Sequence, residues 1–371
     1  MKVRIGDLTK IRTGKLDANA SSENGKYPFF TCSKEPLKIS TYSYDCECVL
    51  VAGNGDLNVK YYNGKFDAYQ RTYIIEDNGS HKIYVPYLYY FMERYIEELR
   101  KQAIGGVIKY IKLGNLTEAV IELPSIEDQK AIVRILEKSK RILNLRHNEL
   151  VALDEFIKAR FVEMFGDLNV NDKGWKVVPL MDVCSQLKRY PTFCNMEYQE
   201  SGVRVIRIGN ILIDGHMDTD DSNYVFVYTN ANVDFPDTVI EMQDIVMAVR
   251  GDGSAAKRIG IIREDKLVGA NISPNLIRIQ ANRNIIEPVW LFYYLTSEVG
   301  QKRLDAYVNK TAKKNIAAKD IARVITPVPD LHLQKNYVDF VNQVNKSKVA
   351  VQKALDEAQL LFDSLMQEYF G

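Results

Sequence analysis

The residue types that usually carry catalysis occur in this chain without the spacing that catalysis needs. No phosphate-binding loop of the G-x-x-x-x-G-K-[ST] type is present, and the glycine-rich segments at 53–56 and 250–254 lack the spacing of a dinucleotide fingerprint. An Asn/Asp-Pro-Pro-aromatic segment, the mark of an amino-methyltransferase, is also missing. The histidines are scattered, with no acid–base or metal-ligand spacing among them: His81, His147, His216 and His332. We therefore expect a non-catalytic chain that binds no metal and no cofactor itself.

Residues suited to nucleic-acid recognition are found instead, in short segments of both halves. Residues 250–258 place three cations among glycines at the end of an expected strand, and residues 302–323 hold seven basic residues against two acids. In the first half, the corresponding places are 53–60, 69–71 and 105–112. Lysine and arginine on phosphates give affinity, whereas arginine, asparagine and glutamine at base edges give specificity.

The candidate DNA-binding residues are therefore the polar and basic side chains of these segments: Asn54, Asn58, Lys60, Gln70, Arg71, Lys109, Lys112, Arg207, Arg250, Lys257, Arg258, Lys310, Lys313 and Lys314. Taken alone, each cluster is more typical of an ordinary solvated surface. Their occurrence at corresponding points of two repeats favours recognition.

The elements that must position these segments are defined by an internal repeat. Residues 124–166 align without a gap to residues 329–371, at an offset of 205, and eight positions are identical, among them Gln129/Gln334 and Phe165/Phe370. Each copy starts after a proline, which can only begin a helix, and ends in a glycine, which commonly closes one. About 38 residues at 1.5 Å each predict a rod of roughly 55–60 Å.

Apolar residues at steps of three, four and seven give each helix a coiled-coil seam. Because neither helix can bury its seam alone, each is expected to pair with the other, with the relative direction left open. The seam residues are Leu136, Leu143, Leu150, Ile157 and Met164 in the first helix, and Val341, Val344, Val351, Leu355, Phe362, Leu365 and Tyr369 in the second.

The repeat also extends upstream of the helices. VLVAGNGD at 49–56 matches IVMAVRGD at 245–252, residues 69–71 face 273–275, and YLYYFM at 87–92 matches WLFYYL at 290–295. The offset between matched segments changes only slightly, and the segments keep the same order in both halves. This indicates one duplicated domain with loop insertions. We expect globular domains at 1–123 and 175–328, long helices at 124–166 and 329–371, and a linker at 167–174. Within the domains, short strands are expected at 27–30, 48–53 and 71–76, and a helix from Pro288 to about Tyr307.

Composition sets broad limits on the class of protein. At 371 residues, with 46% hydrophobic and 26% charged residues, two or more ordinary globular domains are expected. No apolar run is long enough for a membrane span, and the start of the chain is no signal peptide. Five cysteines without zinc spacing are typical of a reduced, cytoplasmic protein. The acidic run 214–221 lacks the pattern of a calcium loop and predicts a solvated loop. A net charge of +1 argues against a protein that simply coats nucleic acid.

These features together resemble the DNA-specificity subunits of type I restriction-modification systems. The resemblance rests on the repeated Leu/Val-Pro-x-x-x-x-Gln-Lys at 123–130 and 328–335, each leading into a long helix that ends in Phe-Gly, and on the matched segments upstream. It covers essentially the whole chain. One departure is that the first domain begins at Met1 without a leader, for which we expect fewer DNA contacts.

The resemblance implies an α/β (α+β) fold. Two mixed α/β target recognition domains would lie in a pseudo-two-fold arrangement, separated by two long helices that form an antiparallel coiled coil. Each domain would read one half of a bipartite DNA sequence, with helix length setting the gap. Two methyltransferase subunits would use S-adenosylmethionine to methylate adenine, and motor-nuclease subunits would cut with ATP and Mg.

Two alternatives stay open at this point. One is the recognition subunit of a related system in which nuclease and methylase are fused, which has the same fold but a different partner. The other is an adaptor that joins two protein-binding domains through a coiled coil without binding DNA, a reading that the near-zero net charge favours slightly.

Overall fold

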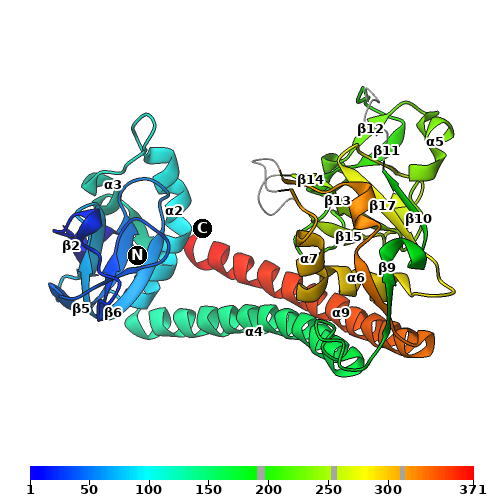
Figure 1. The fold of residues 1–371 in the computed structure, drawn as a ribbon. Coiled ribbons are helices and arrows are strands. Elements are labelled where there is room, and N and C mark those ends of the chain that lie inside the picture. Colours follow the sequence, from blue (N-terminus) through cyan, green and yellow to red (C-terminus); the bar gives the residue numbers. More distant parts are fainter. Residues whose placement is uncertain (190–196, 252–256, 310–313) are drawn as a thin grey trace. The chain divides into compact units, whose positions relative to one another are not determined.

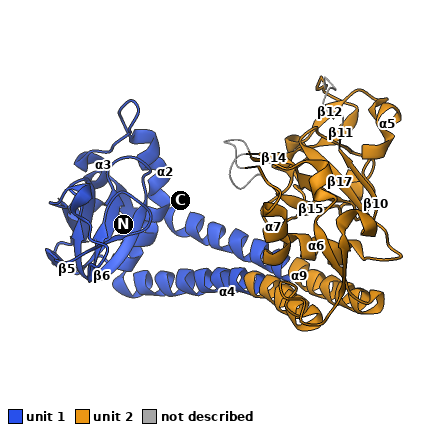
Figure 2. Cartoon of the chain, in the orientation of Figure 1, with its two compact units in different colours: residues 1–150, 350–371 blue, residues 151–349 orange. Residues whose placement is uncertain are grey.

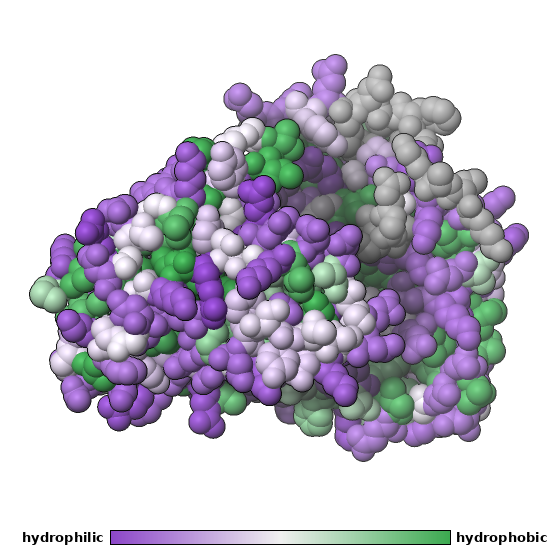
Figure 3. All heavy atoms as spheres, turned by 90° about the vertical axis from the view of Figure 1, so that its left-hand side faces the viewer, coloured by the Kyte–Doolittle hydropathy of each residue, from purple (hydrophilic) through white to green (hydrophobic). Residues whose placement is uncertain are grey.

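The computed structural model describes residues 1–189, 197–251, 257–309 and 314–371 (Figure 1). It contains two compact units (Figure 2): unit 1 comprises residues 1–150 and 350–371, and unit 2 comprises residues 151–349. Each unit therefore holds one globular domain together with part of both long helices. No helix within the described ranges is both long enough and apolar enough to cross a bilayer. On the face drawn in Figure 3, hydrophobic side chains form small patches separated by hydrophilic ones.

The two long helices are α4 (Ile126–Phe165) and α9 (Leu331–Phe370), each of 40 residues, or about 60 Å. Each starts two residues after its proline. At the first turn the Ser125 hydroxyl accepts a bond from the Asp128 N–H (3.1 Å), and the Asp330 carboxylate accepts one from the His332 N–H (2.8 Å). Gly166 follows α4 at a φ of +77°, a conformation that favours glycine and ends the helix.

Within unit 2, the end of α4 packs against the start of α9 in the antiparallel direction. The Tyr337 hydroxyl donates to the Ile157 carbonyl (3.4 Å), and eleven residues further along α9 the Lys348 ammonium lies 2.6 Å from Asp154, which precedes Ile157. Unit 1 combines the other two halves, where Met366 of α9 joins Leu136 of α4 in one buried cluster. In both units the helix pair is part of the core of the domain.

The domain of unit 1 is a six-stranded sheet covered by a helix. Strand order is β2-β7-β5-β6-β3-β4, and a separate pair β1-β8 lies at the entry to α4. The elements are β1 (Lys2–Arg4), α1 (Ile5–Leu8), β2 (Thr9–Thr13), β3 (Tyr27–Phe30), β4 (Leu37–Ile39), β5 (Tyr44–Ala52), β6 (Val59–Ala68), β7 (Thr72–Asp77), α2 (Val85–Gln102), α3 (Leu113–Thr117) and β8 (Val120–Glu122). Of the segments expected as strands, 27–30 coincides with β3, 48–53 overlaps β5 and 71–76 overlaps β7.

The domain of unit 2 contains the same central strands and a larger insertion. Its main sheet has the order β10-β17-β13-β15, a second sheet has the order β12-β11-β16, and β14-β18 and β9-β19 form pairs. The elements are β9 (Lys176–Pro179), β10 (Cys184–Arg189), β11 (Val203–Ile206), β12 (Val225–Val227), α5 (Ala231–Asp234), β13 (Ile245–Ala248), β14 (Arg250–Gly251), β15 (Ile259–Ile261), β16 (Asn271–Ile272), β17 (Leu276–Ala281), α6 (Pro288–Thr296), α7 (Glu298–Asp305), β18 (Lys314–Asn315), α8 (Ala318–Ile321) and β19 (Ile325–Val328).

Strand register in the two sheets agrees with the duplication. In unit 1, Val49 of β5 pairs with Ile75 of β7, and in unit 2, Ile245 of β13 pairs with Ile279 of β17. The two matched segments lie at different offsets, 196 and 204, yet the pairing of their residues is the same. Loop insertions therefore change the offsets without disturbing the sheet.

A single buried glutamine ties the start of α4 to α2 in unit 1. Gln129 is fully buried, and its side-chain oxygen accepts a hydrogen bond from the backbone N–H of Tyr84, just before α2 (2.8 Å). Its amide nitrogen donates to the carbonyls of Lys82 (2.9 Å) and Pro124 (3.1 Å). One side chain thus satisfies three backbone groups and fixes the angle at which the long helix leaves the domain.

The equivalent glutamine makes the same three bonds in unit 2. Gln334 is also fully buried, accepts from the Glu287 N–H before α6 (2.8 Å), and donates to the carbonyls of Ile285 (3.3 Å) and Pro329 (2.8 Å). This shared role accounts for the identity of these two positions in an otherwise divergent repeat.

The identical phenylalanines at the helix ends also make matching contacts. Phe165 at the end of α4 packs edge-on against Trp290 of α6, with ring centres 5.5 Å apart, inside unit 2. Phe370 at the end of α9 packs against Tyr87 of α2, at 5.0 Å, inside unit 1. Each helix therefore begins on the domain that precedes it and ends on the domain of the other repeat.

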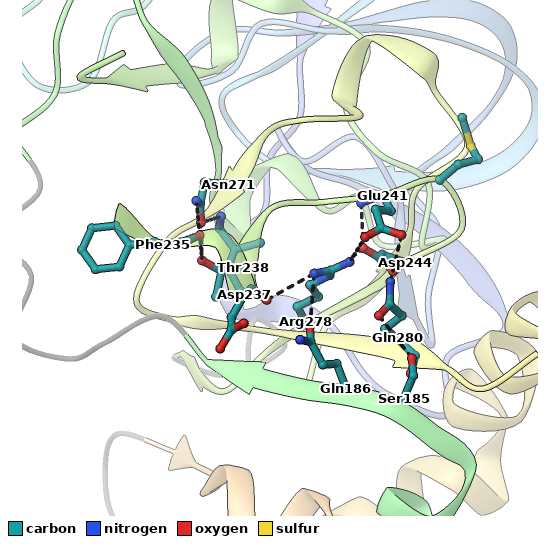
Figure 4. Close-up of polar contacts among 12 residues, drawn as sticks. Ser185, Gln186, Phe235, Asp237, Thr238, Glu241, Asp244, Asn271, Arg278 and Gln280 are labelled. Carbon is teal, nitrogen blue, oxygen red and sulfur yellow. Dashed lines mark hydrogen bonds and ion pairs between the residues drawn. The ribbon is translucent and has the colours of Figure 1, made fainter. Parts of the chain in front are cut away.

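An ion-pair network around the buried Arg278 joins the segment before β13 to β17 of the main sheet (Figure 4). The Arg278 guanidinium, on β17, is 3% exposed and lies 2.7 Å from Asp244 and 3.0 Å from Glu241. It also donates to the Gln186 side chain and to the Asp237 carbonyl. Burial raises the pKa of the Asp244 carboxyl. Unit 1 carries an isoleucine, Ile74, at the position of Arg278, so this network belongs to the second repeat alone.

The structure differs from the sequence-based expectations at three places. The acidic run at 214–221 is not simply a solvated loop, because Met217 within it is buried in a core cluster. The helix expected from Pro288 to about Tyr307 is divided, since Ser297 is extended and its hydroxyl caps α7 by accepting from the Gly300 N–H (3.1 Å). Residues 167–174, expected as a linker, bury Leu168 in the core of unit 2.

Candidate nucleic-acid interface

In unit 1, the three segments expected to recognise DNA meet at one backbone junction. The N–H of Gly53, after β5, donates to the carbonyl of Arg71 (2.8 Å), and the N–H of Ile111 donates to the carbonyl of Gly53 (2.9 Å). The N–H of Gly55 donates to the carbonyl of Lys109 (2.9 Å). Segments distant in sequence are thereby held side by side at the end of the sheet.

Unit 2 builds the same junction from the equivalent residues. The N–H of Val249 donates to the carbonyl of Asn275 (2.9 Å), and the N–H of Ile316 donates to the carbonyl of Val249 (3.0 Å). Strand β14 pairs with β18, which places Gly251 opposite Lys314. Lys314 and Lys109 stand at the same repeat position, so in both units a lysine lies two residues before the isoleucine of the junction.

Each junction lies at an open hollow in the surface of its own unit. The hollow of unit 1 has a volume of about 370 Å³ and is lined by Thr13, Gly53, Gln70, Arg71, Tyr73 and Ile111. In unit 2 a hollow of about 620 Å³ is lined by Tyr198, Arg207, Asn210, Asn275 and neighbouring residues. Polar side chains line part of both hollows, and the lining of the unit 2 hollow also includes Asp218. The cations Arg71 and Arg207 are the lining groups that suit an anionic ligand.

The candidate residues of unit 1 divide into available and occupied side chains. Arg71 and Lys109 are exposed and make no ion pair or side-chain hydrogen bond to another described residue. Asn58 is occupied, since its amide donates to the carbonyls of Cys32 (2.7 Å) and Asp56 (2.8 Å) and its oxygen accepts from Lys60. Burial lowers the pKa of the Lys60 ammonium.

The remaining candidates of unit 1 lie at the rim of the same region. The Gln70 amide is exposed and donates to Asp17 (3.0 Å). Lys112 is exposed, and Asn54, half-buried, forms a bridge with Tyr110 of the neighbouring hairpin. The structure thus brings all of these residues to one end of the domain, with Asn58 and Lys60 turned to internal bonds.

In unit 2, only some of the candidate cations are available. Arg250 is exposed, as is Lys314, and neither forms an ion pair with a described residue. Lys257, by contrast, lies 2.6 Å from Asp305 with its side chain 14% exposed, and Arg258 donates to the Ile211 carbonyl (3.1 Å). Arg207 donates to the Asn223 carbonyl (3.0 Å) and lies over the Tyr198 ring. Lys310 and Lys313 lie outside the described residues.

Arg189 is a cation of this site that the sequence analysis did not identify. It ends β10, where its guanidinium donates to the Pro274 carbonyl (3.2 Å), beside the Asn275 junction. Burial, followed by the nearby charge of Arg250, lowers the pKa of Arg189. Two guanidinium groups held near one another favour an anion between them. In the sequence, Arg189 could have been found only as a basic residue at the end of a short strand. The repeat gave no support, because Thr13 stands at the equivalent position in unit 1.

None of the helix-seam residues expected from periodicity is classed as exposed. Those that are buried are Leu136, Ile157, Val341, Val344 and Val351. Those of intermediate exposure are Leu143, Leu150, Met164, Leu355, Phe362, Leu365 and Tyr369. Apolar residues off the seam are more exposed, such as Ile142 (48%) and Phe156 (53%).

A second cavity of unit 2, of about 750 Å³, is lined by His216, the one histidine among the described residues that is half-buried rather than exposed. Burial, and then the nearby Arg263, lower the pKa of His216. Asp214 and Glu264 act in the opposite sense, and Lys348 acts in the same sense as Arg263. This cavity contains Lys257 and Arg258 but lies apart from the hollow that Arg207 and Asn275 line.

Comparison with known proteins identifies the family. The model of the type I restriction modification DNA specificity domain matches residues 1–154 and again residues 172–358. The chain belongs to the family of type I restriction-modification specificity subunits. The two matches cover most of the chain and correspond to the two copies of the repeat.

Individual relatives in this family align over different lengths. The EcoDI specificity subunit of Escherichia coli is 42% identical over 135 residues, which span 36% of this chain and 30% of that protein. The MjaVIII specificity subunit of Methanocaldococcus jannaschii is 23% identical, with 95% of this chain and 89% of that protein aligned. The EcoBI specificity subunit of E. coli is 22% identical, with 76% and 63% aligned.

Solved structures show the same fold. The S subunit of a type I restriction-modification system from M. genitalium superposes with a TM-score of 0.60 at 16% identity, with 100% of this chain and 96% of that chain covered. A chain from a study of complex assembly and conformational transition in a type I system gives 0.60 at 17% identity, with 100% and 97% covered. The expected fold of two mixed α/β domains with two long helices is confirmed.

Proposed function

We propose that this specificity subunit reads a bipartite sequence in double-stranded DNA, with one globular domain on each half-site. The junction that is built twice carries this proposal. In both units, a strand end, a turn and a third segment meet through equivalent hydrogen bonds, and a lysine, Lys109 or Lys314, stands at the same position beside them. A repeated surface with a repeated cation suits two similar halves of one ligand.

The available side chains at the two junctions are suited to different tasks. Arg71, Lys109, Arg250 and Lys314 are exposed and have no partner among the described residues that would compete with a phosphate or a base edge. Arginine and asparagine at such places read base edges, whereas lysines act mainly on phosphates. Lys257, Arg258 and Asn58 are assigned to holding the loops in shape.

The two long helices would act as a ruler between the half-sites. Glutamine bonds at the start of each helix and a phenylalanine contact at its end attach that helix to the domains. Exposed apolar residues on the outer helix faces, such as Ile142 and Leu145 of α4 and Leu360 of α9, suit the docking of two methyltransferase subunits.

In the assembled complex, catalysis would belong to the partners and this chain would be non-catalytic. The methyltransferase subunits would use S-adenosylmethionine to methylate adenine at N6, and motor-nuclease subunits would add ATP- and Mg-dependent cleavage. We place this activity in the cytoplasm, where the DNA is. The alternative of a recognition subunit for a fused nuclease–methylase uses the same surfaces, and the neighbouring reading frames discriminate between the two.

Methylation mapping by single-molecule sequencing tests the proposal. A host that carries this chain with its neighbouring methyltransferase should show a split motif of two short halves around a fixed gap, with N6-methyladenine in each. An unmethylated genome, in a strain where the same methyltransferase is active with another specificity chain, would reject DNA targeting and favour a protein adaptor.

A further inference from the structure

A short hairpin of unit 1 projects from the proposed DNA-binding surface and carries an apolar tip. It connects α2 to α3 and appears as a narrow loop beyond the end of α2 (Figure 1). Ile104 and Tyr110 close it with two backbone hydrogen bonds, of 3.0 and 2.8 Å. The bond from the Gly55 N–H to the Lys109 carbonyl ties its second strand directly to the junction. The stem is thus held in place by the domain.

The tip is built for exposure of its apolar side chains. Gly105 has a φ of +122°, and a Cβ at this position would meet the Ile108 carbonyl at 2.6 Å, so the turn depends on glycine. Beyond it, the Val107 side chain is fully exposed and Ile108 is 62% exposed. Three further apolar residues within the same short stretch are also exposed: Ile104, Tyr110 and Leu113.

Such a cluster differs from the isolated apolar residues found on every protein surface. Five exposed apolar side chains lie within ten residues of this hairpin, and clusters of exposed apolar residues mark contact surfaces. Its position on a braced hairpin means that little conformational entropy would be lost when the tip enters a partner.

The charges around the tip suit DNA as the partner. Residues 101–117 contain three lysines, Lys101, Lys109 and Lys112, and no acidic residue. Arg71 adds a further exposed cation at the junction from which the hairpin rises. Apolar side chains surrounded by cations match the chemistry of a DNA groove, in which phosphates line the edges and base faces or thymine methyl groups lie inside.

We propose that Val107 and Ile108 form an apolar wedge that enters between base pairs of the half-site bound by unit 1. Side chains of this kind separate neighbouring base pairs and kink the duplex, and the site is then selected partly by how readily its sequence deforms. The inference rests on the proposed function and adds the way in which unit 1 contacts its half-site.

The equivalent segment of unit 2 has a different composition. Residues 308–315 read VNKTAKKN, so at the positions that align with residues 105–108 the sequence has two lysines in place of the apolar pair. The two half-sites would therefore be held differently, with base-step insertion in unit 1 and a stronger phosphate contribution in unit 2.

The test uses the full chain assembled with its methyltransferase subunits and a duplex carrying the target found by methylation mapping. 2-Aminopurine is placed at each step of the two half-sites in turn, because its fluorescence rises when the base is unstacked. The test variant is Val107→Ser with Ile108→Ser. Val170→Ser, at an exposed valine outside the proposed surface, is the matched control, and Lys109→Ala separates phosphate contact from insertion.

For the wild-type complex and the control, we expect raised fluorescence at one step, within the half-site of unit 1. The double variant should lose this rise and bind at least about tenfold more weakly, with an unchanged salt dependence, because apolar burial is lost and no phosphate contact is removed. Lys109→Ala should keep the rise and lower the salt slope by about one.

Two results would overturn the wedge while leaving the proposed function intact. One is specific binding by the wild type with no unstacked step. The other is a double variant that binds DNA within about twofold of the wild type. If that variant also failed to assemble with the methyltransferase subunits, the tip would be assigned to a protein partner. A wild-type complex that does not bind the mapped duplex at all would instead refute the proposed function.

Discussion

Replacement of Gln334 by leucine should loosen unit 2 at the point where α9 leaves the domain. The variant keeps the helical propensity and approximate size of the side chain, but removes three hydrogen bonds to the backbone groups of Glu287, Ile285 and Pro329. Each buried backbone group left without a partner costs about 1–3 kcal/mol. Since leucine regains part of this through apolar burial, we expect a net loss of about 3 kcal/mol.

Hydrogen exchange of the full chain, followed by mass spectrometry, measures this loss locally. An opening free energy lower by about 3 kcal/mol corresponds to exchange faster by roughly a hundredfold. The peptide that contains Glu287 should show this change, and peptides from the domain of unit 1 should not. Gln129→Leu should produce the reciprocal result, with faster exchange around Tyr84 and no change around Glu287.

The matched control is Gln343→Leu, on an exposed position of the same helix. It introduces the same substitution without touching the domain, and its effect on stability should stay within about 0.5 kcal/mol. If Gln334→Leu exchanged like this control at Glu287, the three bonds would not hold the helix to the domain, and the ruler mechanism would lose its rigid attachment.

Three further outcomes follow from the same structure. Insertion of one heptad into both α4 and α9 at the boundary between the units should lengthen the preferred spacer by about three base pairs, since seven helical residues span roughly 10 Å, and an unchanged methylation motif would contradict the ruler. Lys109→Ala and Lys314→Ala should each lower the salt slope of DNA binding by about one, whereas Lys257→Ala, which removes an internal ion pair with Asp305, should leave the slope unchanged. Burial lowers the folded-state pKa of His216, so below the usual histidine pKa the unfolded chain binds a proton at this residue more readily than the folded chain. Unit 2 should therefore lose stability as pH falls from about 7.5 to about 5.5. Thermal unfolding of wild type and His216→Gln at both pH values checks this, and equal losses in the two proteins would assign the pH dependence to other groups.

Local patterns predicted the regular elements because their physical causes are local. The long helices follow from apolar steps of three, four and seven between a proline and a glycine, and the strands β3, β5 and β7 follow from short β-branched and aromatic runs. The short pairs β1-β8 and β9-β19 were not predicted, since three or four residues carry no readable period. The sequence pattern did not predict the break in the helix that starts at Pro288. Ser297, which caps α7, was taken as part of a continuous helix.

The sequence by itself determined that the chain is a duplication, that each copy joins a mixed α/β domain to a long helix, and which segments carry cations. Repetition and periodicity are properties of one dimension and need no coordinates. Only the tertiary structure decided which of those cations are available to DNA. Lys257 is held by Asp305 and Asn58 by backbone carbonyls, whereas Arg71, Lys109 and Arg250 remain exposed. Arg189, on a strand with no repeated signal, is half-buried and donates to the Pro274 carbonyl. These assignments depend on contacts between residues far apart in the chain, and such contacts exist only once the sheet has brought three separate segments to one edge.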